Sequence, residues 1–443
     1  MSTPQEKPSD ARVLRLLQDR PPAPILRGHD EQLYRYNGKC WDRRGDDEVQ
    51  RRLEIMYPDD FSATLARNVR YLLRGVDPLM PPAPPPETKY LINAANGTVD
   101  ISTHPHPTLR PHDPADCFQY VLEHDYDPLA TCPNIDASLA KMFPDPEMVE
   151  LVHEIFGYCL LPAFNLKKAI LLYSRAPHTG KSTLLNLLGA LVGAENEATV
   201  SLQDLDDHRF ARASLQGKLV NRSGDLGAYA PKTSTVFKSI VGGDPVLAEH
   251  KGQQTFALYN TAKLLFAGNS FAGTHESGAA YSERWLVIPF TVEHQSNPDF
   301  LNSVTTPQEL RGLLAHAVRG AARLVARRQF NRPASVSLAE ASLQLETDSV
   351  ARYVAETMTV TPDPDARLDG PRTYENYKTW ATDGGMRPVG RPQFYTRLGD
   401  MPGISIEEGH SRKRFITGVK VAFPTADPGS IVAGWKKVVQ DDD

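Results

Sequence analysis

The residues best suited to chemistry lie in a short polar loop between an apolar run and a helical pattern. The stretch from Leu171 to Leu188 reads LLYSRAPHTGKSTLLNLL. A loop of this kind binds phosphate through backbone N–H groups at the start of the following helix, while Lys181 reaches the β and γ phosphates and the Ser182 hydroxyl binds Mg²⁺. The predicted nucleotide-binding residues are His178, Thr179, Gly180, Lys181, Ser182 and Thr183.

The loop departs from the usual signature at one position. GxxxxGK[ST] has glycine five residues before Gly180, and this chain has Arg175 there. The tight turn must therefore form without its usual achiral residue. Because GK[ST] tripeptides also occur by chance, an ordinary strand-to-helix turn with an exposed lysine remains an alternative.

Three polar residues further along the chain are the natural partners of such a loop. Asp225 follows the apolar run in KLVNRSGDLG and is the candidate second acid for Mg²⁺, with an acid in a surface turn as the alternative. Asn269 ends the apolar run in AKLLFAGN, where its amide could contact the γ phosphate or the attacking water. Arg284 precedes WLVIPF and could stabilise transition-state charge at its own ATP site or at a neighbour's.

The elements that must position these residues alternate as in an α/β domain with a parallel sheet. Between residues 169 and 290, the predicted strands are 169–173, 218–221, 262–266 and 285–289. The stretch 309–330 has apolar residues at i, i+3, i+4 and i+7, which predicts one amphipathic helix with a solvated basic face. We therefore expect an α/β fold, with an ATPase domain at 163–300 and a helical extension at 301–345.

The region ahead of this domain divides at a proline run. Residues 1–22 are expected to be a flexible tail, and 23–80 a small α+β domain with a type I′ hairpin turn at Asn37-Gly38 and a helical segment over 47–73. Residues 81–88 contain the run PPAPPP and predict a stiff linker. Residues 89–162 then predict a turn at Ala95-Asn96-Gly97 followed by helices from about 135 to 161, in a helical, collar-type domain that precedes the ATPase.

The carboxyl-terminal part, 346–425, predicts three helices and a hairpin near Gly409, the pattern of a winged helix, and 426–443 a tail. Tyr374, Tyr377 and Trp380 are expected in its core. The residues expected to be exposed and to contact DNA are Arg391, Gln393, Thr396 and Arg397 on the third helix and His410, Arg412, Lys413 and Arg414 on the wing. A winged helix that docks on protein is the alternative.

Composition limits the classes of function. The net charge of −5 excludes a protein coated with basic residues, so DNA contact must be confined to a groove, channel or small module. The four cysteines, Cys40, Cys117, Cys132 and Cys159, form no CxxC or Cys/His pairing, which predicts a reducing compartment, buried thiols and no zinc framework. With neither a signal region nor a membrane-length apolar run, the protein is expected in the cytoplasm, in a bacterial host or equivalent, with no membrane partner.

The order of these features resembles the superfamily 3 helicases. The nearer resemblance is to the phage and plasmid branch, the helicase part of phage-satellite and poxvirus-type primase-helicases, and it covers roughly residues 90–425. The stretches that carry it are DPLATCPNIDASL, EIFGYCLLP, HRFARASLQGKLVNRSGDL, VFKSIVGGDPVLAEHKGQQTF, AKLLFAGN and ERWLVIPF.

The resemblance implies an AAA+-like P-loop core that uses ATP and Mg²⁺. It implies that Lys181 and Ser182 bind phosphate and Mg²⁺, that Asp225 is the Walker B acid and Asn269 the sensor, and that Arg284 reaches the adjacent subunit of a ring. Lys251 matches the family's hairpin that tracks single-stranded DNA in the central channel, and Lys251 and the adjacent His250 are the DNA contacts expected there. One lysine repeated in each subunit supplies such phosphate contacts without a basic surface.

Two departures from the family bear on hydrolysis. Residues 174–179 replace a glycine- and asparagine-rich loop, and no second acid adjoins Asp225. The region ahead of the helicase is also too short for a primase polymerase domain, so priming activity is not expected.

The leading hypothesis is an ATP-dependent DNA helicase for replication of a phage, prophage, plasmid or satellite element. It would form a homo-oligomeric ring, as a hexamer, act on single-stranded and forked DNA, and work beside a replication initiator or primase. The alternative is a nucleotide-gated DNA-binding initiator or regulator with weak or no hydrolysis. A P-loop kinase of a small molecule is a more distant alternative.

Overall fold

The structure is a computed structural model that describes residues 25–75, 80–81, 84–103, 105–224, 226, 235–269, 279–295, 300–363, 365–386, 388–409 and 413–422, together with Val13 and Leu17. The chain divides into two compact units, residues 1–270 with 284–337, and residues 271–283 with 338–443. Among the described residues, no helix combines the length and the apolar character that crossing a bilayer requires.

A five-stranded parallel sheet forms the centre of the first unit. Its strands are β7 (Ala169–Tyr173), β8 (Glu197–Ala198), β9 (Val220–Ser223), β12 (Lys263–Gly268) and β13 (Trp285–Pro289), in the order β13-β7-β12-β9-β8. The expected α/β architecture is confirmed. The predicted strands 169–173 and 285–289 match β7 and β13, whereas β9 and β12 are displaced by one or two residues and the two-residue β8 was not predicted.

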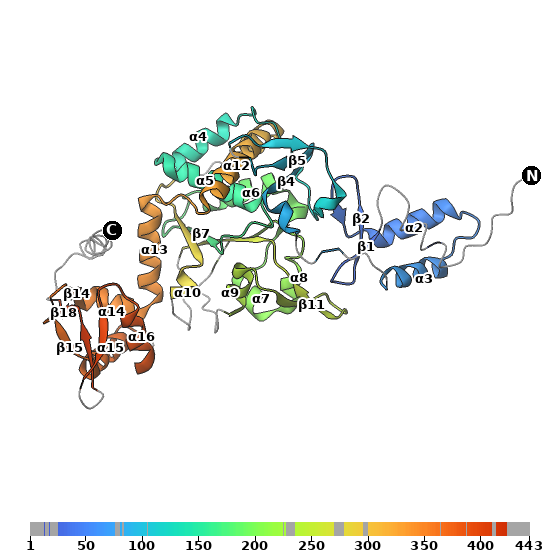
Figure 1. Cartoon of the computed structure of the whole chain (residues 1–443). Coiled ribbons are helices and arrows are strands. Elements are labelled where there is room, and N and C mark those ends of the chain that lie inside the picture. Colours follow the sequence, from blue (N-terminus) through green and yellow to red (C-terminus); the bar gives the residue numbers. More distant parts are fainter. Residues whose placement is uncertain are drawn as a thin grey trace, which may run out of the picture. The chain divides into compact units, whose positions relative to one another are not determined.

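Four helices pack with the sheet into one apolar core. They are α4 (Pro133–Met142), α5 (Pro146–Cys159), α6 (Lys181–Val192) and α12 (Pro307–Arg327). Figure 1 shows α4, α5 and α12 side by side. The α5 and α12 backbones approach closely because Gly157 and Gly320 lie at their contact, where a Cβ would come within 2.4 Å of backbone atoms of the other helix.

The basic face of α12 is not fully solvated, which corrects the sequence-based expectation. The Glu154 side chain is fully buried and accepts hydrogen bonds from Arg327 Nη2 and from the Asn331 backbone, the latter at 2.8 Å. Arg323 Nε lies 3.7 Å from the same carboxylate. A buried carboxylate requires charged or hydrogen-bonding partners, and α12 supplies them from its basic face.

The amino-terminal part contains a small sheet and two helices. The strands are β1 (Leu26–Arg27), β2 (Leu33–Tyr36) and β3 (Trp41–Asp42), and the helices are α2 (Gly45–Met56) and α3 (Ala63–Leu73). The single helical segment predicted over 47–73 is wrong, because the chain leaves the helix at Tyr57, immediately before Pro58. The type I′ turn is also wrong. Only Gly38 has a positive φ, of 98°, and Asn37 Oδ1 instead accepts from the N–H groups of Lys39 and Cys40.

Hydrogen bonds join the residues on the two sides of the proline-rich segment. The 3₁₀ turn η1 (Pro86–Tyr90) begins within it, and the strands β4 (Leu91–Ala94), β5 (Gly97–Asp100) and β6 (Thr108–Arg110) follow, with the predicted turn at residues 95–96. Trp41 N donates to Phe118 O at 2.7 Å, and Asn93 Nδ2 donates to Lys39 O at 2.9 Å. The β1–β3 sheet therefore packs on the segment that leads into the helices.

The first unit also contains further short helices and a two-stranded hairpin. They are η2 (Pro114–Asp116), η3 (Ala194–Asn196), α7 (Leu202–Asp207), α8 (Arg209–Ala213), α9 (Thr235–Gly242), the hairpin strands β10 (Val246–Glu249) and β11 (Thr255–Leu258), and α11 (Phe300–Val304).

The second unit has its own core. Its elements are α10 (Ala279–Ser282), most of α13 (Ala334–Thr347), α14 (Ser349–Thr357), β14 (Met358–Val360), β15 (Arg367–Asp369), α15 (Gly370–Asp383), α16 (Arg391–Gly399), β16 (Ser405–Glu408), β17 (Arg414–Thr417) and β18 (Val419–Val421). The three predicted helices correspond to α14, α15 and α16, and the predicted hairpin to β16 and β17. Tyr377 is fully buried, and Tyr374 and Trp380 pack beside it, which confirms the expected aromatic core.

Candidate nucleotide site and DNA-contacting residues

The loop from Ser174 to Gly180 follows the carboxyl end of β7 and leads directly into α6. Gly180 caps α6 with a φ of 95°, and a Cβ there would lie 3.1 Å from Met142 Sδ. Both the backbone angle and the close approach of α4 favour glycine at this position. Because α6 is apolar and packs in the core, its amino-terminal N–H groups are held at the edge of the sheet, where the helix dipole favours an anion.

Arg175 does not require a left-handed backbone. The non-glycine residue of the loop with a positive φ is His178, at 55°, and Arg175 is not among the described residues that have one. The Ser174 hydroxyl closes the turn instead, by accepting from Ala176 N at 3.2 Å and donating to Ala176 O at 3.1 Å. The loop thus forms its turn through a serine side chain, which removes the geometric reason for glycine at position 175.

Lys181 and Asn269 meet at the carboxyl edge of the sheet. Lys181 Nζ donates to Asn269 Oδ1 at 2.8 Å, and two loop carbonyls, those of Ser174 and Ala176, lie 3.5 Å from it. Burial lowers the pKa of Lys181. Asn269 directly follows β12, and Lys181 begins α6 at the end of the loop after β7, the parallel neighbour of β12, so the sheet and the loop together bring the two side chains into contact. The two residues are 88 positions apart in the sequence.

A cavity opens beside the loop. It encloses about 410 Å³ of space accessible to water, within the range of small-molecule sites. Its lining residues are Ser138, Lys141, Met142, His178, Gly180, Thr183, His294, Gln295 and Phe300. His294 N donates to His178 O at 2.9 Å, which ties the loop to the chain after β13. The lining residues Ser138, Lys141 and Met142 of α4 were not predicted from the sequence, although their i, i+3 and i+4 spacing places them on one helix face.

Ser182, Thr183 and Thr179 differ in how far their side chains are exposed. Ser182 is exposed on the first turn of α6, and Thr183 is half-buried beside the cavity. Thr179 is 2% exposed, and its Oγ1 has no hydrogen-bond partner among the described residues. A buried hydroxyl without a partner at the start of a helix fits a polar ligand at this loop.

Asp225 lies outside the described residues. Residues on both sides of it have defined contacts: β9 ends at Ser223, and Leu226 N donates to Ala267 O at 2.8 Å. These contacts hold the flanking chain at the carboxyl edge of β12, next to Asn269.

Arg284 lies at the amino ends of the parallel strands, whereas Lys181 lies at their carboxyl ends. Its carbonyl accepts from Ala169 N at 2.7 Å, immediately before Trp285 pairs with Ala169. Because β7 and β13 run parallel, Arg284 precedes the amino end of the sheet, whereas Lys181 follows the carboxyl end. The structure therefore does not bring Arg284 to the Lys181 site of its own chain.

The hairpin of β10 and β11 presents Lys251 to solvent. Lys251 is exposed in the connecting turn, followed by Gly252 with a φ of 79°. Helix α8 anchors the base of the hairpin, since Arg209 Nε lies 2.5 Å from Glu249 Oε2 and Arg212 Nη1 donates to Leu247 O at 3.2 Å. Lys251 thus lies at the tip of a hairpin whose base is held by α8.

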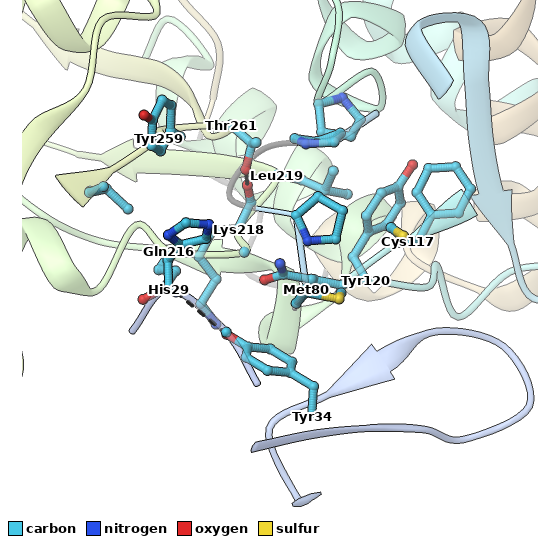
Figure 2. A pocket seen from close by; sticks show the side chains of 18 of the residues that line it. His29, Tyr34, Met80, Cys117, Tyr120, Gln216, Lys218, Leu219, Tyr259 and Thr261 are labelled. Carbon is cyan, nitrogen blue, oxygen red and sulfur yellow. Dashed lines mark hydrogen bonds between the residues drawn. The ribbon is translucent and has the colours of Figure 1, made fainter. Parts of the chain in front are cut away.

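His250 faces away from the hairpin tip. Its ring stacks on Phe256 with centroids 5.2 Å apart, and Nε2 lies 3.3 Å from Gln216 Oε1. Gln216 Nε2 in turn donates to Tyr34 OH at 3.4 Å, across a second cavity where residues 216–219 approach β2 (Figure 2). Burial raises the pKa of Tyr34 to about 12, so its hydroxyl stays protonated. This chain of polar contacts links the hairpin base to the amino-terminal sheet.

The predicted DNA-contacting residues of α16 and the wing have unequal exposure. Gln393 and Thr396 are exposed, and Arg391 is exposed but paired with Glu375 Oε1 at 2.9 Å. The prediction that Arg397 is exposed is wrong. Its side chain is 11% exposed and lies 3.3 Å from Asp348 Oδ1, the carboxylate that caps α14.

On the wing, Arg414 lies over the Tyr395 ring at 5.0 Å, and Lys413 Nζ is 2.5 Å from Asp369 Oδ2. His410 and Arg412 lie outside the described residues. The basic side chains of the wing that are described are thus held in part by contacts within the second unit.

Comparisons with known proteins relate two stretches of the chain to families. Residues 25–144 match the family described as D5 N terminal like, and residues 172–284 match a family of unknown function (DUF5906). No curated protein matches the sequence. Among solved structures, the chain is similar to the A form apo structure of the NrS-1 C-terminal region, with 11% identity, a TM-score of 0.46, and coverage of 90% of this chain and 96% of that one. A second apo structure of that region gives 10% identity, a TM-score of 0.45, and the same coverage.

Proposed function

We propose that this protein is an ATP-dependent DNA helicase that serves the replication of a phage, prophage, plasmid or satellite element. The contact of Lys181 Nζ with Asn269 Oδ1, at the carboxyl edge of adjacent parallel strands, carries the proposal. A cation and an amide held together beside a helix amino terminus form a suitable site for the terminal phosphates of a nucleotide. The match of residues 25–144 to D5 N-terminal-like domains adds support for a replication protein of the primase-helicase type.

The residues present fit ATP and Mg²⁺. Lys181 and the amino terminus of α6 would hold the phosphates, the Ser182 hydroxyl and Asp225 would hold the metal, and the cavity lined by α4 offers room for the rest of the nucleotide. The metal would neutralise charge on the phosphates when bound. Asn269 would orient the terminal phosphate or the attacking water.

The position of Arg284 supports a ring in which ATP lies between subunits. An arginine at the amino edge of the sheet acts on a nucleotide at the carboxyl edge only if the two belong to different chains. In a hexamer the exposed Lys251 hairpins would line the channel and contact successive phosphates of single-stranded DNA. The second unit would bind duplex DNA or a replication partner.

The test is ATP hydrolysis by the purified chain, with and without single-stranded and forked DNA. The proposal expects hydrolysis that DNA stimulates and that Lys181→Ala and Asn269→Ala abolish, while Lys39→Ala, at an exposed lysine of the amino-terminal turn, leaves it unchanged. ATP binding without hydrolysis on any DNA would instead support the nucleotide-gated initiator. Hydrolysis that ignores DNA and transfers phosphate to a soluble acceptor would support a kinase.

A further inference from the structure

Three side chains from two helices that line the same core form a compact cluster away from the nucleotide loop. Cys132 caps the amino terminus of α4, Asp136 lies in its first turn, and His316 lies in the middle of α12. One ligand atom from each residue lies within 4.8 Å of the other two. Cys132 Sγ is 3.6 Å from Asp136 Oδ1, and His316 Nε2 is 3.5 Å from the same oxygen.

The two separations from Asp136 Oδ1 are those of neighbouring ligands around a tetrahedral zinc ion, and the third pair lies within 4.8 Å. Metal–ligand bonds of about 2.0–2.3 Å place neighbouring ligand atoms roughly 3.3–3.7 Å apart. A thiolate, an imidazole and a carboxylate are also the three side-chain types that zinc accepts, and their mixture of soft and hard donors disfavours Mg²⁺ and Ca²⁺.

A buried nitrogen without a partner adjoins the cluster. The His153 ring, on α5, stacks on the His316 ring with centroids 4.6 Å apart, and His153 is 8% exposed. Its Nε2 has no hydrogen-bond partner among the described residues. The unprotonated nitrogen of a neutral imidazole can accept a hydrogen bond or bind a metal. A buried nitrogen without a partner beside the cluster points to a polar ligand there.

The surroundings tolerate a cation. The buried carboxylate of Glu309 accepts from the N–H groups of Asn134 and Ile135 and adds negative charge beside Cys132. Two arginines lie near the cluster: Arg319 directs Nη1 to Pro128 O at 3.1 Å, and Arg323 Nε lies 3.7 Å from the Glu154 carboxylate. His316 and Asp136 are 24% and 44% exposed, so an ion can enter from solvent, whereas Cys132 is fully buried.

We propose that Cys132, Asp136 and His316 bind one zinc ion, with a water molecule at the fourth position beside His153. The absence of paired cysteine spacing had predicted no zinc framework, because the cluster forms only when α4 packs on α12. The ion would cross-link these helices. Since α4 also carries Ser138, Lys141 and Met142, which line the cavity beside the phosphate loop, the metal would fix one wall of that cavity.

The test is the metal content of the full chain and does not depend on ATP hydrolysis. Protein loaded with zinc, then passed through gel filtration and measured by mass spectrometry of the metal, should retain about one zinc per chain. Cys132→Ala should lose it, whereas Cys159→Ala, which truncates an equally buried cysteine outside the cluster, should keep it. Retention of the same zinc by Cys132→Ala, or none by the wild type, would overturn the proposal.

Cobalt provides a second readout. Cobalt in place of zinc should give a thiolate charge-transfer band and the visible bands of a tetrahedral ion, both lost in Cys132→Ala. If Cys132→Ala fails to fold by circular dichroism, Asp136→Asn decides. This variant keeps the size of an exposed side chain, and we expect its zinc affinity to fall at least tenfold. Unchanged zinc affinity in folded Asp136→Asn, or a cobalt spectrum of an octahedral ion without the thiolate band, would also overturn it.

Discussion

Mixing two inactive variants tests whether Arg284 serves the nucleotide of a neighbouring subunit. Arg284 precedes the amino end of β13, and Lys181 follows the carboxyl end of the adjacent strand β7. A five-residue strand spans roughly 17 Å, so the length of the sheet separates the two residues within one chain. If Arg284 stabilises the transition state across an interface, Arg284→Ala should reduce hydrolysis on the order of a thousandfold while ATP binding persists.

The rate of ATP hydrolysis expected for the mixture of the two variants can be calculated. Lys181→Ala keeps its arginine and Arg284→Ala keeps its lysine, so an interface works wherever the intact lysine of one meets the intact arginine of the other. In a ring assembled at random from equal amounts, about one quarter of the interfaces have this pairing, and DNA-stimulated hydrolysis should return to about a quarter of the wild-type rate.

The control replaces one partner by the double variant, Lys181→Ala with Arg284→Ala, which should restore nothing. Subunit exchange is verified with fluorescently labelled chains. If exchange occurs and the mixture stays inactive, Arg284 does not act across an interface. If Arg284→Ala alone hydrolyses ATP normally, the residue has no part in the reaction.

Three further outcomes are expected. Lys251→Ala should weaken single-stranded DNA binding and the stimulation of hydrolysis by DNA, while basal hydrolysis stays unchanged. Lys39→Ala is the control, and equal effects of the two variants would show that the hairpin does not contact DNA. Removal of the charges at Arg412 and Arg414 should weaken duplex binding and reduce its salt slope by about one for each phosphate that the wing no longer neutralises, and unchanged binding would assign the second unit to protein docking. Hydrogen bonds from arginines, that of Arg51 foremost, lower the pKa of Glu48 to about 2, so its contribution to stability is present above about pH 4 and is lost as the pH falls towards 2. In urea melts over that range, Glu48→Gln should lose less stability than the wild type, and parallel losses would contradict this origin.

The sequence predicted those elements whose patterns are local. The strands at 169–173 and 285–289, the helix over 309–327 and the aromatic core at Tyr377 follow from runs and periodicities that packing did not override. The break at Tyr57 was present in the sequence as Pro58, but the apolar spacing on both sides obscured it. The two-residue strand β8 has too few residues for any periodicity.

The candidate site was harder to predict wherever a side chain is held by a distant partner. Arg397 has the sequence pattern of an exposed basic residue, yet Asp348, 49 positions away, holds it at 11% exposure. His250 has the position of a hairpin tip and is turned inward by Phe256 and Gln216. Position 175 was expected to need glycine because the local turn was assumed to be the usual one, whereas the Ser174 hydroxyl closes a different turn.

Unwinding of a forked duplex is the most direct test of the proposed function. A fluorescently labelled fork is incubated with the purified chain and ATP, and strand separation is followed in time with a trap for the released strand. We predict separation that requires hydrolysable ATP, is absent in Lys181→Ala and is retained in Lys39→Ala. Active, DNA-stimulated ATP hydrolysis without strand separation on forks of either polarity would contradict a helicase.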